Sequence, residues 1–232
     1  MRTELKGRIA VVTGAAGTMG RAVVAALAAD GMKVVGLDVK PAQGCVVCDI
    51  SNAEAVRKAM RAIGRVDVLV NNAGILSNNK SQATTPEEWR RVLAANLDGA
   101  FYLSRAVIPG MKQRRWGRIV NTCSLAAKTG GLTAGTAYAT SKGGLTSLTF
   151  SLARELAPFG VTVNGISPAY VKTPMVTRQL NAAQRKAVLA QIPVGRFCEP
   201  EEFAHVVRFL VHPLAGFITG EIVDLNGGVI MD

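Results

Sequence analysis

The sequence predicts an α/β fold, a doubly wound, seven-stranded parallel sheet with helices on both faces. Short apolar stretches of strand length alternate with stretches of helical length along the whole chain, which is typical of a parallel sheet covered by helices. Of the 232 residues, 49% are hydrophobic and 19% charged, which suits a large buried core. Because neither a linker-like composition nor a repeat divides the chain, we expect a single domain over residues 1–232.

The first half of the sequence contains four predicted strands and two predicted helices. Glycine after the first helix is a natural C-terminal stop, and Ser51 or Asn52 is available to cap the second helix. The apolar segment from Cys45 to Ile50 reads as a buried strand. We expect strands over residues 8–12, 33–37, 46–48 and 67–70, and helices over residues 18–30 and 52–63.

The second half continues the alternation. Thr85 is a suitable cap for a long helical region that has Pro86 in its first turn, and Pro158 marks the end of a later helix. Residues 174–195 contain a segment that reads as a short helical lid over a substrate. We expect helices over residues 86–111, 138–157 and 199–210, and strands over residues 118–122, 161–166 and 221–225.

The net charge of +11 and the sequence pI near 10.0 raise the question of an anionic partner. The basic residues are scattered, however, and their densest stretch, residues 112–118, falls where a helix ends, a position that favours cations. No apolar run reaches the ~18 residues of a membrane span. Glycines interrupt the first 30 residues, so these do not form an export signal. We therefore expect a cytoplasmic protein that binds neither nucleic acid nor membrane.

Cysteine and histidine are too sparse for a metal site or a serine hydrolase. Cys45 and Cys48 form the only C-x-x-C, and no second pair supplies further ligands. His205 and His212 are the only histidines, and neither accompanies a nucleophile-elbow sequence. We expect no metal and structural cysteines.

The first predicted strand runs directly into a segment of small residues that opens the next helix. Small residues allow a diphosphate to approach the backbone, and the helix N-terminus supplies amide donors. The strand before and the helix after provide the context that a dinucleotide site requires. The sequence therefore predicts a Rossmann-type site at Thr13-Gly14-Ala15-Ala16-Gly17-Thr18-Met19-Gly20.

An acidic residue, Asp38, stands at the end of the second predicted strand, 18 residues after Gly20. A carboxylate at this position accepts hydrogen bonds from the adenosine ribose and repels a 2′-phosphate. This favours NAD over NADP as the cofactor, although the nearby Lys40 works against that preference.

Tyr138 and Lys142 are four residues apart in a helical segment, so their side chains lie on one face, one turn apart. A phenol with its ordinary pKa of ~10 is almost entirely protonated at neutral pH. A neighbouring ammonium favours the phenolate, which would make the pair an acid/base device. A surface pair is the alternative for this spacing taken alone.

Together with Asn71-Asn72-Ala73-Gly74 and Thr219-Gly220-Glu221, these motifs resemble the short-chain dehydrogenase/reductase family over essentially the whole chain. The resemblance implies that Tyr138 is the general acid/base and that Lys142 lowers its pKa and binds the nicotinamide ribose. Ser124 would orient the substrate oxygen, and Asn96 would hold a water linking Lys142 to solvent. The residues implied in cofactor binding are Gly14, Gly17, Thr18, Met19, Gly20, Asp38, Asp49, Ile50, Asn72, Ala73, Gly74, Tyr138, Lys142, Pro168, Val171 and Thr173.

The chain departs from the family pattern at three positions. Thr18 stands at the middle glycine of the phosphate loop, with Gly17 just before it. Ser124 lies 14 residues before Tyr138, slightly further than is usual in the family. Ala169 replaces the glycine that commonly follows the proline after strand six.

For the reaction, these features favour hydride transfer between NAD and a secondary alcohol or ketone, sugars and polyols included. The family alternative is a reductase of 3-oxoacyl groups on acyl carrier protein: Arg114 and Arg115 suit an acidic carrier, whereas Asp38 and Phe159 argue against it. A dinucleotide-binding regulator without catalysis is a third hypothesis. The resemblance also implies a homo-oligomer, a tetramer or a dimer.

Overall fold

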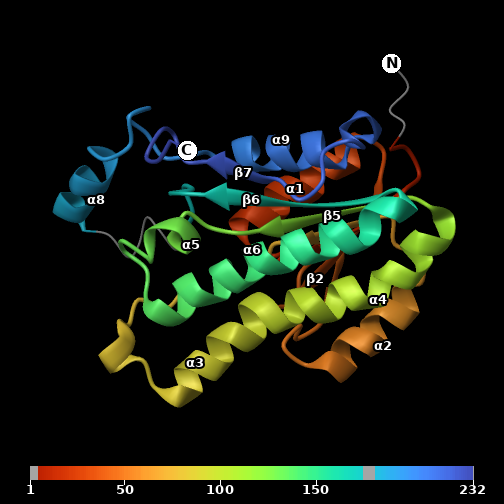
Figure 1. Cartoon of the computed structure of the whole chain (residues 1–232), viewed down its shortest axis with the longest axis horizontal. Coiled ribbons are helices and arrows are strands. Elements are labelled where there is room, and N and C mark those ends of the chain that lie inside the picture. Colours follow the sequence, from red (N-terminus) through yellow and green to blue (C-terminus); the bar gives the residue numbers. More distant parts are fainter. Residues whose placement is uncertain (1–4, 175–180, 232) are drawn as a thin grey trace.

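A computed structural model describes residues 5–174 and 181–231 of the chain, which form an α/β structure around one sheet (Figure 1). The sheet has seven parallel strands in the order β3-β2-β1-β4-β5-β6-β7. The order reverses direction between β1 and β4, which is the place where open α/β sheets bind ligands. The strands are β1 (Ile9–Thr13), β2 (Lys33–Asp38), β3 (Cys45–Val47), β4 (Val68–Asn71), β5 (Gly117–Thr122), β6 (Val161–Pro168) and β7 (Ile222–Leu225).

Helices cover both faces of the sheet, with α1 and α9 on one face and α2, α4 and α6 on the other (Figure 1). The helices are α1 (Thr18–Ala29), α2 (Ala53–Ile63), α3 (Pro86–Leu93), α4 (Gly99–Arg114), α5 (Ala126–Thr129), α6 (Thr136–Leu156), α8 (Ala182–Leu189) and α9 (Pro200–Val211). None of the helices in this described part of the chain is long and apolar enough to cross a membrane.

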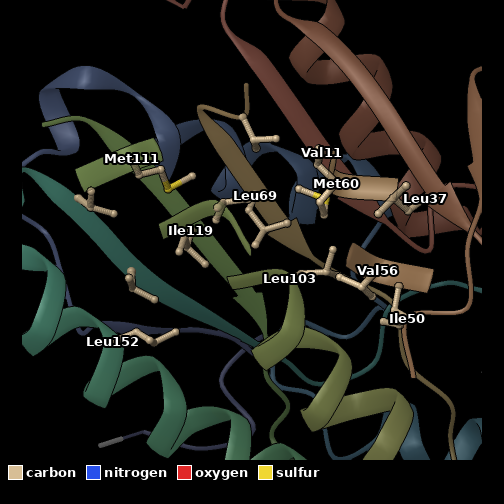
Figure 2. Close-up of a cluster of buried hydrophobic side chains, with 14 of the residues drawn as sticks. Val11, Leu37, Ile50, Val56, Met60, Leu69, Leu103, Met111, Ile119 and Leu152 are labelled. Atoms are coloured by element: carbon tan, nitrogen blue, oxygen red, sulfur yellow. The ribbon is translucent and has the colours of Figure 1, made fainter. Parts of the chain in front are cut away.

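The strands divide their side chains between two hydrophobic cores, because successive residues of a strand point to opposite faces. In β1, Val11 packs with Leu103 of α4 in the core shown in Figure 2. Its neighbours Ala10 and Val12 pack against α1 and α9, together with the fully buried Phe203. Both faces are therefore dry, which is why the strands read as continuous apolar runs in the sequence.

The predicted fold class is confirmed, and the caps were also predicted correctly. The Asn52 side chain accepts hydrogen bonds from the first turn of α2, and Thr85 caps α3 with Pro86 in its first turn. Three details differ. The third strand is not buried, because β3 is the edge strand and Val47 is 61% exposed. The long helical region contains a π-helical segment, Ala94–Asp98, and the short helix α5 was not predicted.

The carboxyl ends of the strands, the glycine-rich loop after β1 and the segments around α5 and α8 lie at one edge of the sheet, toward which the arrowheads of β6 and β7 point in Figure 1. Helix α8 falls within the predicted lid around residues 174–195, whereas residues 175–180 lie outside the described residues. Its function as a lid, and the single domain, remain predictions.

Candidate active site

A cavity of about 200 Å³ opens at this edge of the sheet. Aliphatic side chains such as Ile75, Leu76, Leu125 and Leu132 form much of its wall. The structure brings nine of the residues predicted for the site into its lining: Met19, Asn72, Gly74, Ser124, Tyr138, Lys142, Pro168, Val171 and Thr173.

Tyr138 and Lys142 reach the cavity from the first two turns of α6, which begins at Thr136. The Lys142 side chain is 3% exposed, and its Nζ lies 5.8 Å from the centre of the Tyr138 ring. Nζ donates a hydrogen bond of 2.5 Å to the carbonyl oxygen of Thr122, at the end of β5. The ammonium is therefore held between the sheet and the phenol ring.

Burial dominates the electrostatics of this pair. It lowers the pKa of Lys142 to about 8, since a buried ammonium loses its hydration. It also raises the pKa of Tyr138 above its ordinary value, while a hydrogen bond with Ser124 acts in the opposite direction. The expected lowering of the Tyr138 pKa by Lys142 is thus not realised in this structure. At neutral pH Tyr138 holds its proton and is a donor.

Ser124 lies two residues beyond β5, and its Oγ accepts a hydrogen bond of 3.1 Å from the backbone N–H of Ala126 at the start of α5. This bond fixes a hydroxyl that is 8% exposed on the cavity wall close to Tyr138. A carbonyl oxygen placed between the two hydroxyls would meet two hydrogen-bond donors, the arrangement that carbonyl chemistry requires.

Asn96 is buried in the π-helical segment between α3 and α4. Its amide group exchanges two hydrogen bonds with the backbone of Ile75, of 2.8 and 3.0 Å, and donates a third, of 3.0 Å, to Ser141 on α6. These contacts tie the loop after β4 to the helix that carries Tyr138 and Lys142. Asn96 is thus a positioning residue in this structure, and the water that it was predicted to hold remains a prediction.

The glycine-rich loop fits a diphosphate. Gly14 has a φ of +65° and lies against Ala73, and a Cβ on Gly20 would come within 2.1 Å of the Gly14 carbonyl oxygen. Gly17 precedes α1, and no side chain caps the first turn of this helix. The amide groups at Thr18, Met19 and Gly20 therefore remain available to an anion at the helix N-terminus.

Two side chains that were predicted to touch the cofactor brace this loop, and their contact with the cofactor remains a prediction. Asp38 accepts hydrogen bonds from the backbone N–H of Ala16 (2.9 Å) and of Lys40 (3.0 Å), one at each carboxylate oxygen. Asn72 donates to the carbonyl oxygen of Thr13 (2.9 Å), while the Thr13 hydroxyl accepts from the N–H of Asn72 and of Ala73. The ends of β1, β2 and β4 are thereby locked together.

The other predicted cofactor residues divide between the cavity and its surroundings. The exposed Asp49 accepts two hydrogen bonds from Ser51, and the Ile50 side chain is buried in the core, so any contact of Ile50 with adenine would involve its backbone. The Gly74 position is close to Asn96 and Lys142, where a Cβ would meet the Asn96 Oδ1 at 3.1 Å.

Sequence reasoning missed three residues that support the site. The Thr122 carbonyl oxygen accepts the hydrogen bond of Lys142. The Ser141 hydroxyl accepts a hydrogen bond from Asn96 and donates one of 2.7 Å to the Tyr138 carbonyl oxygen. Lys80 donates to the carbonyl oxygens of Gly131 and Ala134, both at 2.7 Å, and so holds the loop before α6. Only Thr122 carried a signal, its place at the end of a predicted strand; the contacts of Ser141 and Lys80 depend on tertiary packing.

Comparison with known proteins gives matches over nearly the whole chain. A family model described as Enoyl-(Acyl carrier protein) reductase matches residues 14–230. The chain is 41% identical to the 3-oxoacyl-[acyl-carrier-protein] reductase FabG of Vibrio cholerae, over 98% of this chain and 99% of the relative, and equally to that of Escherichia coli. Among solved structures, the 3-oxoacyl-[acyl-carrier protein] reductase of Brucella melitensis is 33% identical with a TM-score of 0.92, over 100% of this chain and 94% of that one.

Two further solved structures concern sugar chemistry and the cofactor. The aldohexose dehydrogenase of Thermoplasma acidophilum is 33% identical with a TM-score of 0.90, over 98% of this chain and 95% of that one. A structure from Beutenbergia cavernae, described as an NAD(P) dependent gluconate 5-dehydrogenase with bound NADP at low occupancy, is 34% identical with a TM-score of 0.92, over 99% of both chains.

The predicted preference for NAD over NADP is wrong, since this last neighbour holds NADP. The prediction rested on Asp38 facing the ribose. In the structure both oxygens of that carboxylate accept hydrogen bonds from backbone amides, and the positively charged Lys40 follows two residues later. Asp38 therefore stabilises the loop, and its presence does not identify the dinucleotide.

Proposed function

Because the chain belongs to the short-chain dehydrogenase/reductase family and is an oxidoreductase that acts on alcohol or ketone groups, we propose that it reduces the ketone of 3-oxoacyl thioesters with NADPH. The observation that carries this proposal is the Tyr138 hydroxyl, which lies beside Ser124 in a cavity with several aliphatic side chains in its wall. A protonated phenol suits reduction, which consumes a proton at the carbonyl oxygen. The similarity to 3-oxoacyl-[acyl-carrier-protein] reductases supports the same substrate class.

In the proposed reaction Ser124 donates a hydrogen bond to the substrate carbonyl oxygen and fixes its position. Tyr138 donates its hydroxyl proton to that oxygen as the carbonyl becomes an alcohol. The bound NADPH supplies the hydride to the carbonyl carbon. The Lys142 ammonium, held by Thr122, stabilises the phenolate that remains, because an opposite charge nearby favours the ionised form.

The amide groups at the start of α1 and the glycines Gly14, Gly17 and Gly20 would hold the diphosphate of the dinucleotide. Met19, Pro168, Val171 and Thr173 would flank its nicotinamide end, since they line the cavity with Tyr138. The roles of all these residues are part of the proposal.

The basic side chains predicted to suit an acidic carrier, Arg114 and Arg115, lie where α4 ends and β5 begins, at the edge of the sheet opposite the catalytic cavity. Arg115 is exposed there and donates to the carbonyl oxygen of Pro158, and the Lys112 Nζ lies 4.0 Å from the centre of the Phe159 ring. Arg114 does not contribute, because it turns inward toward the buried Asp67, with its Nε 3.4 Å from a carboxylate oxygen. Lys112 and Arg115 are therefore separated from Tyr138 by the length of β5 and β6, and they do not support the carrier interaction. That interaction is proposed on the similarity to the acyl-carrier-protein reductases.

A sugar or polyol dehydrogenase is the second candidate, because two structural neighbours are described as sugar-related dehydrogenases. The cavity walls formed by Ile75, Leu76, Leu125 and Leu132 argue against it, since a polyol needs hydrogen-bond partners for each hydroxyl group.

We further propose a homo-oligomer, a tetramer or a dimer, and retain the predicted cytoplasmic location. Phe101 on α4 and Phe150 on α6 are 42% and 48% exposed, which suits a helical interface between copies. Light scattering on the purified protein would measure the number of subunits, and cell fractionation would locate it.

The function is tested by mixing the enzyme with NADPH and the four-carbon substrate acetoacetyl thioester at neutral pH, and following the absorbance of the reduced nicotinamide. We expect turnover with acetoacetyl thioesters on both coenzyme A and acyl carrier protein, and a lower KM for the carrier-bound form. Arg115→Ala should leave both reactions nearly unchanged, because Arg115 lies at the edge of the sheet opposite the cavity.

The same assay separates the alternatives. Turnover of a polyol panel with NADP⁺ in place of NADPH, with no turnover of any thioester, would favour the sugar dehydrogenase. Binding of NADPH with no turnover of either panel would favour the regulator and contradict the proposed function.

A further inference from the structure

A second cavity, of about 150 Å³, adjoins the catalytic one. We call it the tail chamber. The two cavities share Ala169 and Tyr170 in their walls. The tail chamber is lined by Ala169, Tyr170, Ile192, Val194, Arg196, Cys198, Glu202, Leu225, Asn226 and Gly227.

Three segments that are distant in the sequence build the tail chamber, namely residues 169–171 after β6, residues 192–202 after α8 and residues 225–227 at the end of β7. Backbone hydrogen bonds connect them: Cys198 N–H donates to the Tyr170 carbonyl oxygen (3.0 Å), and Val194 N–H donates to that of Gly227 (3.2 Å). The chamber is therefore a formed part of the fold.

The polar side chains of the chamber already have partners within the protein. Arg196 donates two hydrogen bonds, of 2.6 and 2.7 Å, to the Glu202 carboxylate. This pairing lowers the pKa of Glu202 to about 2, so the pair stays ionised and its charges cancel. Asn226 bonds to the backbone of Ile230 and Gly228, and the Cys198 thiol to that of Glu199.

The remaining walls are apolar, formed by Ala169, Ile192, Val194 and Leu225. A charged or hydroxylated group that gave up hydration on entering this chamber would find the polar side chains around it already engaged, which is costly. An alkyl group has no hydrogen bonds to water to lose, and the transfer of its apolar surface out of water is favourable. The chamber thus selects for an uncharged, apolar occupant.

Tyr170 forms the wall between the two cavities and is held from both sides. Its ring lies 6.3 Å from that of Phe197, and its hydroxyl is 3.4 Å from the Thr133 hydroxyl in the loop before α6. A substrate that reaches both cavities must pass along this ring and the small side chain of Ala169.

We propose that the tail chamber receives the alkyl end of the substrate and that Tyr170 divides this end from the reacting end. The chamber has room for up to about five carbons of a straight chain, in addition to the carbons that pass along Tyr170. The length follows from the volume, since a group the size of a water molecule takes about 30 Å³. The proposal rests on the proposed function and adds the preferred chain length. A 3-oxooctanoyl thioester has five carbons beyond the ketone, and we expect the last of them to enter the chamber, whereas an acetoacetyl thioester does not reach it.

The test compares kcat/KM for the four-carbon and eight-carbon 3-oxoacyl thioesters in the wild type and in Val194→Trp. Val194 lines the tail chamber and is absent from the lining of the catalytic cavity, and it is 59% exposed, so the fold tolerates a larger side chain. We expect the ratio of the eight-carbon to the four-carbon kcat/KM to fall about tenfold or more in Val194→Trp, with the four-carbon value unchanged. Val194→Ala is the matched control and should preserve the wild-type ratio.

Tyr170→Ala is the second variant and should raise the relative kcat/KM of a substrate branched at the tail, because it joins the two cavities. A ratio within about twofold of wild type in Val194→Trp overturns the tail chamber, even where Tyr170→Ala has an effect, since Tyr170 also lines the catalytic cavity. Absence of turnover of the four-carbon thioester by the wild type would contradict the proposed function instead.

Discussion

Two regions at the carboxyl edge of the sheet use their side chains differently. We call the glycine-rich loop with the ends of β1, β2 and β4 the nucleotide end, and the cavity around Ser124 and Tyr138 the catalytic end. At the nucleotide end, the side chains of Thr13, Asp38 and Asn72 form hydrogen bonds with backbone groups at or beside the ends of β1, β2 and β4. The groups left for a ligand there are backbone amides. At the catalytic end, Ser124 and Tyr138 present their hydroxyl groups to a cavity, and backbone contacts only hold them in place.

This difference has a consequence for mutations. At the nucleotide end, the loss of a side chain removes a brace, so stability and dinucleotide affinity should fall together. At the catalytic end, the loss of a hydroxyl removes a reacting group that little else depends on, so turnover should fall while folding and affinity remain. Each variant below is a test of that separation.

Tyr138→Phe is expected to have the largest effect. Removing the proton donor should lower kcat by about 10³-fold or more, in the range of general acid catalysis. The free energy of unfolding and the Kd for NADPH should stay close to the wild-type values, because the ring that packs in the cavity is retained. Stopped-flow turnover, urea unfolding and calorimetric titration with NADPH measure the three quantities. Substantial retained turnover would remove Tyr138 from its role.

Lys142 belongs to the catalytic end, but its ammonium is also buried. Its replacement should therefore change the stability of the protein as well as its turnover. Burial lowers its pKa to about 8 from 10.5, so the unfolded chain binds more protons than the folded one between these values. The contribution of Lys142 to the stability of the wild type without dinucleotide should therefore rise with pH from about 8 to 10.5. Lys142→Met lacks this gain, and we expect the wild type to improve relative to it by about 3 kcal/mol across the window.

Urea unfolding of both proteins at several pH values in this window measures the difference. The exposed Lys58 on α2 provides the matched control, since Lys58→Met should follow the wild type at every pH. Parallel curves for the wild type and Lys142→Met would show that the ammonium is not desolvated.

The fold could be predicted from the sequence because buried strands and helix starts have characteristic local residue patterns. Strands with two dry faces read as apolar runs, and helix starts carry caps such as Asn52 and Thr85. The exposure of β3 could not be predicted in this way. Val46 and Val47 are apolar, and only the strand order of the sheet shows that they lie at its edge. The sequence also did not predict the π-helical turn at Asn96, where this residue bonds to Ile75 and Ser141 in segments distant along the chain.

The site was predictable where a residue acts through its own chemistry. Tyr138, Lys142 and Ser124 reach one cavity, as their motifs indicated. The pKa of Tyr138 was not predictable, because helical spacing describes the distance between two side chains but not their burial. The NAD preference drawn from Asp38 was wrong for a similar reason, since a carboxylate at a strand end offers the same oxygens to a ribose and to the loop beside it.

Asp38→Ala is expected to have the smallest effect of the three and bears most directly on the nucleotide end. Without the carboxylate, the N–H groups of Ala16 and Lys40 lose their acceptor, which should lower the free energy of unfolding by about 1–2 kcal/mol. The glycine-rich loop loses its fixed shape with it, so the Kd for NADPH should rise about fivefold to tenfold. Asp38→Asn, which keeps one acceptor oxygen, should show about half of each effect, and Glu87→Ala, at an exposed carboxylate on α3, should show neither.

The coupling of the two measurements decides what Asp38 does. A brace predicts that stability and NADPH affinity fall together in Asp38→Ala and recover together in Asp38→Asn. A carboxylate that faces the ribose predicts the opposite, tighter binding of NADPH by Asp38→Ala at unchanged stability, because removing the negative charge relieves repulsion of the 2′-phosphate. That second result would mean that the nucleotide end, like the catalytic end, acts through side chains aimed at its ligand, and the distinction between the two regions would no longer hold.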